Sequence, residues 1–171
     1  IMKKIGFIGI GLMGLPMAKN LLKAKYELKA FNRTIKKAEP LKEFGAEISQ
    51  SIKEVVSNSD IIITMLTDDV SVDQVMEDKD FLENIKPGAT VIDMSSVKPE
   101  TAKSHGENLK SKNINYLDAP VSGGTIGAEE ATLAIMVGGE QKVFDDNIDI
   151  LKVMGNPTLV GPLTSGQVSK L

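Results

Sequence analysis

The sequence contains no cysteine and no tryptophan, and its only histidine is His105. The lack of cysteine excludes disulfide bonds, thiolate catalysis and cysteine-ligated zinc. It is also typical of proteins from the reducing cytoplasm, where we expect this one to be located. His105 lies in the polar, helix-like stretch 99–112. We therefore expect it to be a solvated helix residue and not a general base.

Long apolar runs and clustered charge are missing as well. No run approaches the roughly 18 apolar residues of a membrane span, and no secretory signal pattern opens the sequence. The net charge is −3, and the basic residues are scattered along the chain. We therefore expect neither a membrane nor a nucleic-acid partner. With 171 residues, of which 42% are hydrophobic, the chain is long enough for one well-packed domain.

What the sequence does contain is an alternation of apolar, strand-like runs with helix-like segments. This spacing indicates parallel βαβ units. Right-handed crossovers between buried strands then give an α/β fold with a doubly wound, mostly parallel sheet of the Rossmann kind. Strands are expected at 4–10, 28–32, 60–66, 90–94, 115–119, 134–137 and 158–160, and helices at 12–24, 36–44 (interrupted by Pro40), 52–57, 70–76, 100–112 and 141–151. Ligands of such sheets bind at the carboxyl ends of the strands.

A glycine loop follows the first expected strand and opens the first expected helix. Its residues are Gly9, Ile10, Gly11, Leu12, Met13 and Gly14. In this context the G-x-G-x-x-G pattern is typical of a dinucleotide site. The first glycine permits a tight turn, the second lets the pyrophosphate approach the backbone, and the third lets the helix pack closely on the strand. The alternative is a glycine-rich turn in an α/β domain of another kind.

The second expected strand ends in Asn32, Arg33 and Thr34, about 20 residues after the loop. Sites that prefer NAD usually place a carboxylate here for the ribose hydroxyls. This sequence offers an amide, a guanidinium and a hydroxyl, and Arg33 is suited to a charge-assisted contact with a 2′-phosphate. We therefore predict NADP as the cofactor, with NAD still possible. The alternative is an arginine that points into solvent.

Three separated motifs resemble the β-hydroxyacid dehydrogenase family, which includes 3-hydroxyisobutyrate dehydrogenase and the glyoxylate/succinic semialdehyde reductases. They are the opening segment 6–18, the segment Asp118-Ala119-Pro120-Val121-Ser122-Gly123-Gly124, and the segment 161–170, and the likeness runs over essentially the whole chain. The resemblance implies that Met65 and Leu66 line the adenosine half of the cofactor and that Ser96 lies near the nicotinamide ribose. It further implies that Ser122, Gly123 and Gly124 hold a substrate carboxylate and that Lys170 is the acid–base residue.

Physical chemistry independently supports the last two assignments, the carboxylate-binding turn and the acid–base lysine. Successive N–H groups in a Ser-Gly-Gly turn can point at one anion, although a plain turn after an edge strand remains the alternative. Reduction of a carbonyl leaves an alkoxide that must gain a proton, and a lysine ammonium can supply it. A surface lysine is the alternative for Lys170, but its place in Gly166-Gln167-x-x-Lys170 favours the functional interpretation.

Two positions depart from the family pattern. Ala131 replaces a frequent glycine, where it would tighten a turn. Thr164 replaces another glycine, and we expect it to cap the helix that carries Lys170. We expect residues 2–163 to be a dinucleotide-binding domain and residues 164–171 to be the truncated start of an interdomain helix. The family's all-helical second domain, which carries the dimer interface, is absent from this chain. Because of that interface, we expect the full-length enzyme to be a homo-oligomer.

The predicted function is an oxidoreductase that transfers a hydride between NADP(H) and a small hydroxy acid or its semialdehyde or keto acid. An imine reductase of related architecture is one alternative, but Lys170 argues against it because those proteins usually carry another residue there. The other alternative is a cofactor-binding domain that is inactive by itself.

Overall fold

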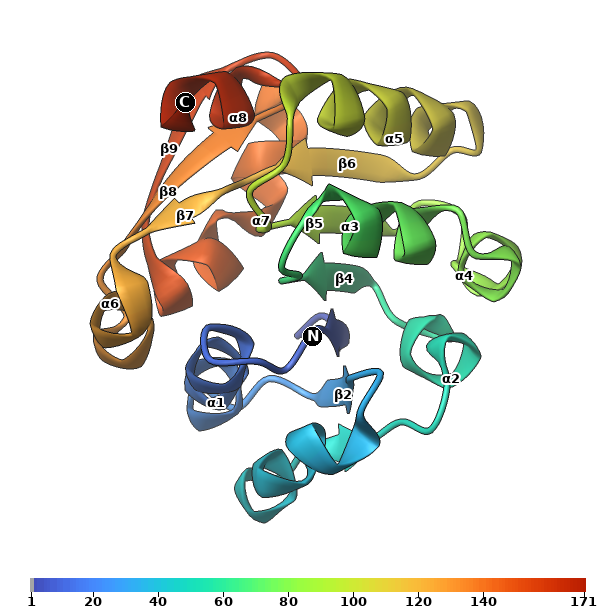
Figure 1. The fold of residues 1–171 in the computed structure, drawn as a ribbon, viewed down its shortest axis with the longest axis vertical. Coiled ribbons are helices and arrows are strands. Elements are labelled where there is room, and N and C mark those ends of the chain that lie inside the picture. The colour runs from blue at the N-terminus through green and yellow to red at the C-terminus, as the bar shows by residue number, and fades with distance from the viewer. Residues whose placement is uncertain (1) are drawn as a thin grey trace.

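The structure is a computed structural model that describes residues 2–171, and it contains one sheet with helices on both faces (Figure 1). The strands are β1 (Ile5–Ile8), β2 (Leu28–Phe31), β3 (Glu47–Ile48), β4 (Ile61–Thr64), β5 (Thr90–Asp93), β6 (Asn115–Asp118), β7 (Val121–Ser122), β8 (Leu133–Gly138) and β9 (Gly155–Gly161). The helices are α1 (Gly14–Lys23), the 3₁₀ helix η1 (Ile35–Phe44), α2 (Ile52–Val56), α3 (Asp69–Met76), α4 (Lys79–Asn84), α5 (Pro99–Ser111), α6 (Gly124–Glu130), α7 (Gln141–Met154) and α8 (Ser165–Lys170).

The sheet order confirms the predicted doubly wound fold. The strands lie in the order β3-β2-β1-β4-β5-β6-β8-β7, and β9 pairs with β8. All pairs from β3 to β6 are parallel, whereas β8 runs antiparallel to β6 and β7. The chain therefore builds outward from β1 in both directions, and the crevice between β1 and β4 is the switch point at which such folds bind ligands.

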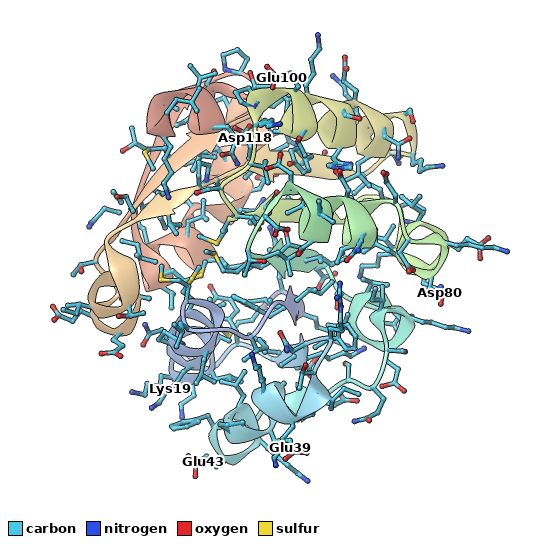
Figure 2. All side chains as sticks on the ribbon, viewed as in Figure 1. Lys19, Glu39, Glu43, Asp80, Glu100 and Asp118 are labelled. Carbon is cyan, nitrogen blue, oxygen red and sulfur yellow. The ribbon has the colours of Figure 1, made fainter. Side chains whose placement is uncertain are left out.

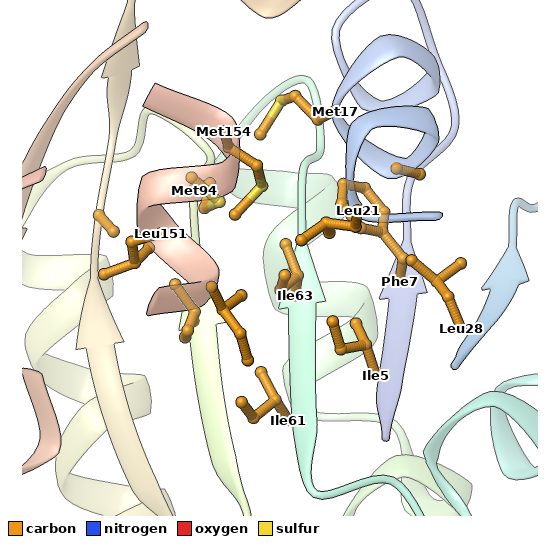
Figure 3. Close-up of a cluster of buried hydrophobic side chains, with 14 of the residues drawn as sticks. Ile5, Phe7, Met17, Leu21, Leu28, Ile61, Ile63, Met94, Leu151 and Met154 are labelled. Atoms are coloured by element: carbon orange, nitrogen blue, oxygen red, sulfur yellow. The ribbon is translucent and has the colours of Figure 1, made fainter. Parts of the chain in front are cut away.

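The core has two layers because both faces of the central strands are covered. Ile61 and Ile63 of β4 face the layer that includes α1 and α7, and Ile62 between them faces α2, α3 and α5. Figure 3 shows the first layer, in which Met17 from α1 and Met154 from α7 meet over the sheet. Since neither face is left to solvent, the strands read as continuous apolar runs, as expected for a parallel sheet.

The long periodic segments have the predicted type, with ends shifted by a few residues. The sequence did not predict β3, β7, α4 or α6. Each of these is short, and the two-residue strands depend on a partner strand rather than on a local pattern. The segment around Pro40 is a 3₁₀ helix and not an α-helix. Proline lacks the N–H that an α-helical turn would use. None of the helices in the described part of the chain is long and apolar enough to cross a membrane.

The prediction that His105 is a solvated helix residue is wrong. Its exposed fraction is 5%, and its Nε2 lies 2.6 Å from the Asp73 Oδ1 on α3. Ala102 and Leu109 of α5 are buried on the same side of the helix. His105 falls on that stripe at helical spacing, so the periodicity of the segment contained the signal that its overall polarity hid.

Candidate functional site

The three glycines of the loop after β1 have three separate structural roles. Gly9 has a φ of +105°, and a Cβ on it would lie 2.2 Å from the carbonyl oxygen of Met65. A Cβ on Gly14 would lie 1.9 Å from the carbonyl oxygen of Gly9. A Cβ on Gly11, in contrast, would meet nothing within 4 Å. Gly9 and Gly14 are thus needed for the turn and for close packing of α1, whereas Gly11 leaves open space beside the start of a helix. This geometry fits a bound pyrophosphate.

Asn32 fastens this loop to the end of β2. Its Oδ1 accepts a hydrogen bond from the backbone N–H of Ile10 at 2.9 Å, and its Nδ2 donates to the carbonyl oxygen of Thr34 at 3.0 Å. Thr34 and Arg33 are exposed. The Arg33 guanidinium donates a hydrogen bond to the side-chain oxygen of Gln74 on α3. The exposed arginine therefore contacts α3, the helix that follows β4.

The loops after β4 and β5 are joined by a buried serine. Ser95 accepts a hydrogen bond from the backbone N–H of Leu66 at 2.8 Å. Met65 and Leu66 are half-buried, and Ser96 is exposed at the same edge. These predicted cofactor-lining residues therefore lie in adjacent loops, next to the glycine loop after β1.

Below this edge lies a buried carboxyl group, that of Asp93 at the end of β5. Its Oδ1 accepts hydrogen bonds from the Thr64 hydroxyl at 2.9 Å and from the Ser95 N–H at 3.1 Å. Burial raises the pKa of Asp93 to about 6, although these hydrogen bonds and His105 oppose the shift. Asp93 was not among the predicted site residues, because a strand-end aspartate carries no local mark of burial.

Residues 122–124 form a sharp turn between β7 and α6. Gly123 has a φ of +140° and Gly124 a φ of +64°, both in the region that favours glycine. Ser122 and both glycines are exposed. The Lys170 ammonium at the end of α8 donates a hydrogen bond to the carbonyl oxygen of Val121. The structure thus brings together the predicted carboxylate turn and the predicted acid–base lysine, which lie far apart in the sequence.

The helix that carries Lys170 is capped by Asp118. This carboxylate accepts hydrogen bonds from the N–H of Thr164 at 2.8 Å and of Gln167 at 3.0 Å. Burial raises the pKa of Asp118, and the N–H groups oppose that rise. Thr164 occupies the N-cap position with a φ of 85°, and its side chain makes no capping hydrogen bond. The prediction that Thr164 caps α8 is therefore wrong, because the Asp118 carboxylate and not the Thr164 hydroxyl accepts from the N–H groups at the start of the helix.

The other glycine replacement also adopts a left-handed backbone. Ala131, the residue that follows α6, has a φ of 58°. It closes the turn between α6 and β8, as predicted. The left-handed region costs non-glycine residues about 1–3 kcal/mol. Both departures from the family's glycines thus keep the glycine-like turn.

Predicted site residues follow the carboxyl ends of five neighbouring parallel strands, and the last of them, Ser122, lies in β7 beside β8. In sheet order, β2 contributes Arg33, β1 the glycine loop, β4 Met65 and Leu66, and β5 Ser96, and the chain after β6 leads to Ser122. Neighbouring strands lie about 4.8 Å apart, so the row spans about 19 Å. It matches an extended ligand with one end near Arg33 and the other near Lys170. Within residues 2–171, no three His, Asp or Glu side chains are placed to hold a metal ion.

A wide groove runs beside the glycine loop, along α1 and toward α6. Its volume is about 710 Å³, and Gly11, Leu12 and Thr125 are among its lining residues. Lys37 also lines it, and the sequence analysis did not select this lysine. The N–H of Lys37 donates to the carbonyl oxygen of Thr34 at 3.0 Å. Lys37 therefore adds a lysine to the wall of this groove, which also carries Lys19 and Lys23.

This fold and the three-glycine geometry define the chain as a dinucleotide-binding domain of the Rossmann class. It belongs to the family described as the NAD binding domain of 6-phosphogluconate dehydrogenase, whose model matches residues 4–162. A related protein is 2-hydroxy-3-oxopropionate reductase of Escherichia coli, which is 41% identical over 98% of this chain. The alignment covers 58% of the Escherichia coli protein.

Solved structures agree with this assignment. A 3-hydroxyisobutyrate dehydrogenase of Mycobacterium tuberculosis with L-serine has a TM-score of 0.95 and 33% identity, covering 99% of this chain and 58% of that one. An imine reductase of Myxococcus stipitatus in complex with NADP+ has a TM-score of 0.92 and 25% identity, covering 98% and 58%. The predicted resemblance to hydroxyacid dehydrogenases is confirmed. The chain is a nicotinamide-cofactor domain of an oxidoreductase family that includes hydroxyacid dehydrogenases and imine reductases.

Proposed function

We propose that residues 2–163 form the cofactor domain of an NADP-preferring dehydrogenase, and that residues 164–171 lead into a second domain. The substrate is a small hydroxy acid or the matching semialdehyde or keto acid. One observation carries this proposal: the ammonium of Lys170 lies on the Val121 carbonyl, directly beside the Ser122 to Gly124 turn. An anion-binding turn and a proton donor thus meet at one end of the cofactor edge.

Each part of this edge has a defined task in the proposal. Gly11 and the start of α1 hold the pyrophosphate, Arg33 holds the 2′-phosphate, and Ser96 contacts the ribose of the nicotinamide half. The bound cofactor supplies or accepts the hydride. Residues 122–124 bind the substrate carboxylate through backbone N–H groups. Lys170 gives its proton to the carbonyl oxygen as that oxygen becomes an alkoxide, and the neutral amine takes the proton back in the oxidative direction.

Lys170 also favours the hydroxy-acid reaction over imine reduction, the second activity named among the structural neighbours. The substrate carboxylate is an anion, and the carbonyl oxygen gains negative charge during reduction. An ammonium group stabilises both, whereas it would repel the iminium cation that forms when an imine is protonated on nitrogen. The proposed partners are accordingly a small carboxylate substrate and further copies of the complete enzyme.

Replacement of Lys170 by alanine in the complete enzyme tests the proposal. Turnover of succinic semialdehyde or glyoxylate should fall by about 10²- to 10⁴-fold, the usual contribution of a positioned acid–base group. The cofactor Kd should stay close to that of the unmodified enzyme. Lys142→Ala, which removes an exposed lysine on α7, is the matched control. Unchanged turnover in Lys170→Ala would contradict the assignment of Lys170. If the 171-residue chain alone were as active as the complete enzyme, a second domain would not be required for the reaction.

A further inference from the structure

The helix α8, which carries Lys170, has little apolar anchoring of its own. It is six residues long, and its buried residues are Gly166 and Gln167. Val168, an apolar side chain of the helix, is 54% exposed. A helix this short is not stable by itself. Its position, and with it the position of Lys170, must therefore be set by specific polar contacts and by close backbone packing.

The backbone packing comes from Gly166. A Cβ at this position would lie 2.3 Å from the carbonyl oxygen of Met136 on β8 and 2.7 Å from that of Asp118 on β6. The first turn of α8 thus lies directly on two strands. The buried Asp118 carboxylate, labelled beside α8 in Figure 2, accepts hydrogen bonds from N–H groups of that turn. These contacts fix the start of the helix but do not reach toward the cofactor edge.

Gln167 makes the connection toward the cofactor edge. Its Oε1 accepts a hydrogen bond from the Val97 N–H at 3.1 Å, and its Nε2 donates to the carbonyl oxygen of Ser95 at 2.8 Å. The side chain is 2% exposed, and both hydrogen bonds are buried. The amide therefore forms hydrogen bonds with the residues on both sides of Ser96, the residue with the proposed ribose contact. A hydrocarbon at this position would leave a buried donor and a buried acceptor unpaired.

The contacts continue from this loop across the cofactor edge. Ser95 accepts from the Leu66 N–H at 2.8 Å, and its own N–H donates to Asp93 at 3.1 Å. An unbroken set of hydrogen bonds therefore runs from the loop after β4, through Ser95 and Gln167, to α8. Each link is a discrete contact between buried or partly buried groups, so a shift of the 95–97 loop is passed to the helix.

We propose that Gln167 is a positioning residue that couples occupancy of the cofactor site to the placement of Lys170. Contact of the cofactor with the 95–97 loop lowers the mobility of that loop. Through the hydrogen bonds of the Gln167 amide, this lowers the mobility of α8 as well. The lysine is then held in its reactive position when the cofactor is present. The inference rests on the proposed function, because it takes Lys170 as the acid–base residue.

Hydrogen exchange of the 164–171 segment, with and without NADPH, tests the coupling without a need for activity. In the unmodified chain, NADPH should slow exchange in this segment. Gln167→Leu should exchange faster there and should show no slowing by NADPH, although NADPH still binds. Gln167→Glu keeps the size and the acceptor toward Val97 but sets an oxygen against the Ser95 carbonyl, so it should also lose the slowing. The matched control Gln50→Leu, at an exposed glutamine, should behave as the unmodified chain.

Kinetics of the complete enzyme provide the second arm. Gln167→Leu should lower kcat by about 10- to 100-fold, the range expected for a misplaced catalytic group, while the KM for NADPH stays nearly unchanged. A merely structural role would instead lower thermal stability and leave the kcat of the folded fraction intact. Slowing by NADPH that persists in both Gln167 variants, or an unchanged kcat, would overturn the inference. If Lys170→Ala retains turnover, the proposed function fails, and that outcome is separate because the exchange experiment does not involve catalysis.

Discussion

Asp93 and Asp118 are directly opposite each other on β5 and β6, yet their carboxylates have different surroundings. Both oxygens of Asp118 accept backbone N–H groups from the start of α8. The Asp93 Oδ1 accepts from the Thr64 hydroxyl and the Ser95 N–H, whereas its Oδ2 is buried with no hydrogen-bond partner within residues 2–171. An ionised group that is buried and half-satisfied is costly. Asp93 is therefore the residue at which stability should depend most clearly on pH.

Asp93→Asn tests this dependence. Because the pKa is about 6 in the folded state and 3.8 without the fold, the folded state binds more protons between these values. Asp93 thus favours folding at low pH, and this contribution is lost as pH rises through about 6. A shift of this size corresponds to about 3 kcal/mol. Asparagine retains an acceptor for Thr64 and Ser95 but does not titrate.

Urea unfolding at about pH 4 and about pH 8 measures the effect. Relative to Asp93→Asn, the unmodified protein should be more stable at the lower pH and lose that advantage at the higher pH. A difference between the two proteins that is the same at both pH values would show that Asp93 does not titrate in this range.

Arg33 is the residue that should decide between the two nicotinamide cofactors. Arg33→Ala removes the charge proposed to bind the 2′-phosphate, and a charge-assisted hydrogen bond contributes about 1.5–3 kcal/mol. The NADP Kd should therefore rise by about 10- to 100-fold, with little change for NAD. Equilibrium titration measures both, and Lys53→Ala at an exposed site on α2 is the control. Equal losses for NADP and NAD would remove the assignment.

In the strand–loop–helix unit of β1 and α1, two glycines are needed for close packing, and we propose that the third, Gly11, serves cofactor binding. Gly14→Ala places a methyl group 1.9 Å from the Gly9 carbonyl oxygen, whereas Gly11→Ala meets nothing within 4 Å. Gly14→Ala should lower the free energy of unfolding by about 1–3 kcal/mol or more, as overpacking does. Gly11→Ala should unfold like the unmodified protein. Urea unfolding of the two variants makes the comparison, and similar losses in both would contradict the assigned roles.

Elements with a continuous apolar run or a clear helical periodicity could be predicted from the sequence. Short elements that depend on pairing with a neighbouring strand could not. The runs that became β1, β4 and β5 are continuous and buried on both sides, which is a local property of the sequence. β7, in contrast, is two residues long and exists because it pairs with β8. His105 is a different case, since its helical spacing from Ala102 and Leu109 carried the signal for burial, but the polarity of the segment favoured solvent.

At the scale of the whole molecule, the motifs could be predicted but not the contacts that join them. The G-x-G-x-x-G pattern identified the glycine loop, and the family resemblance identified the 122–124 turn and Lys170, each as a separate candidate. The contact between Lys170 and Val121 joins residues 49 positions apart. The hydrogen bonds of Gln167 to Val97 and Ser95 join residues that are 70 and 72 positions apart. Such pairs follow from the sheet order β5-β6-β8, with β9 beside β8 and leading into α8. A single sequence does not carry that information.

The central claim is that the carboxyl edge of this sheet binds a nicotinamide dinucleotide over the glycine loop. Calorimetric titration of the 171-residue chain with NADP+ and NAD+, alongside Gly11→Ala, tests it most directly. We expect saturable binding at a single site, tighter for NADP+ than for NAD+, and clearly weaker binding by folded Gly11→Ala. Absence of saturable binding for both cofactors, or equal affinity of Gly11→Ala, would contradict the claim.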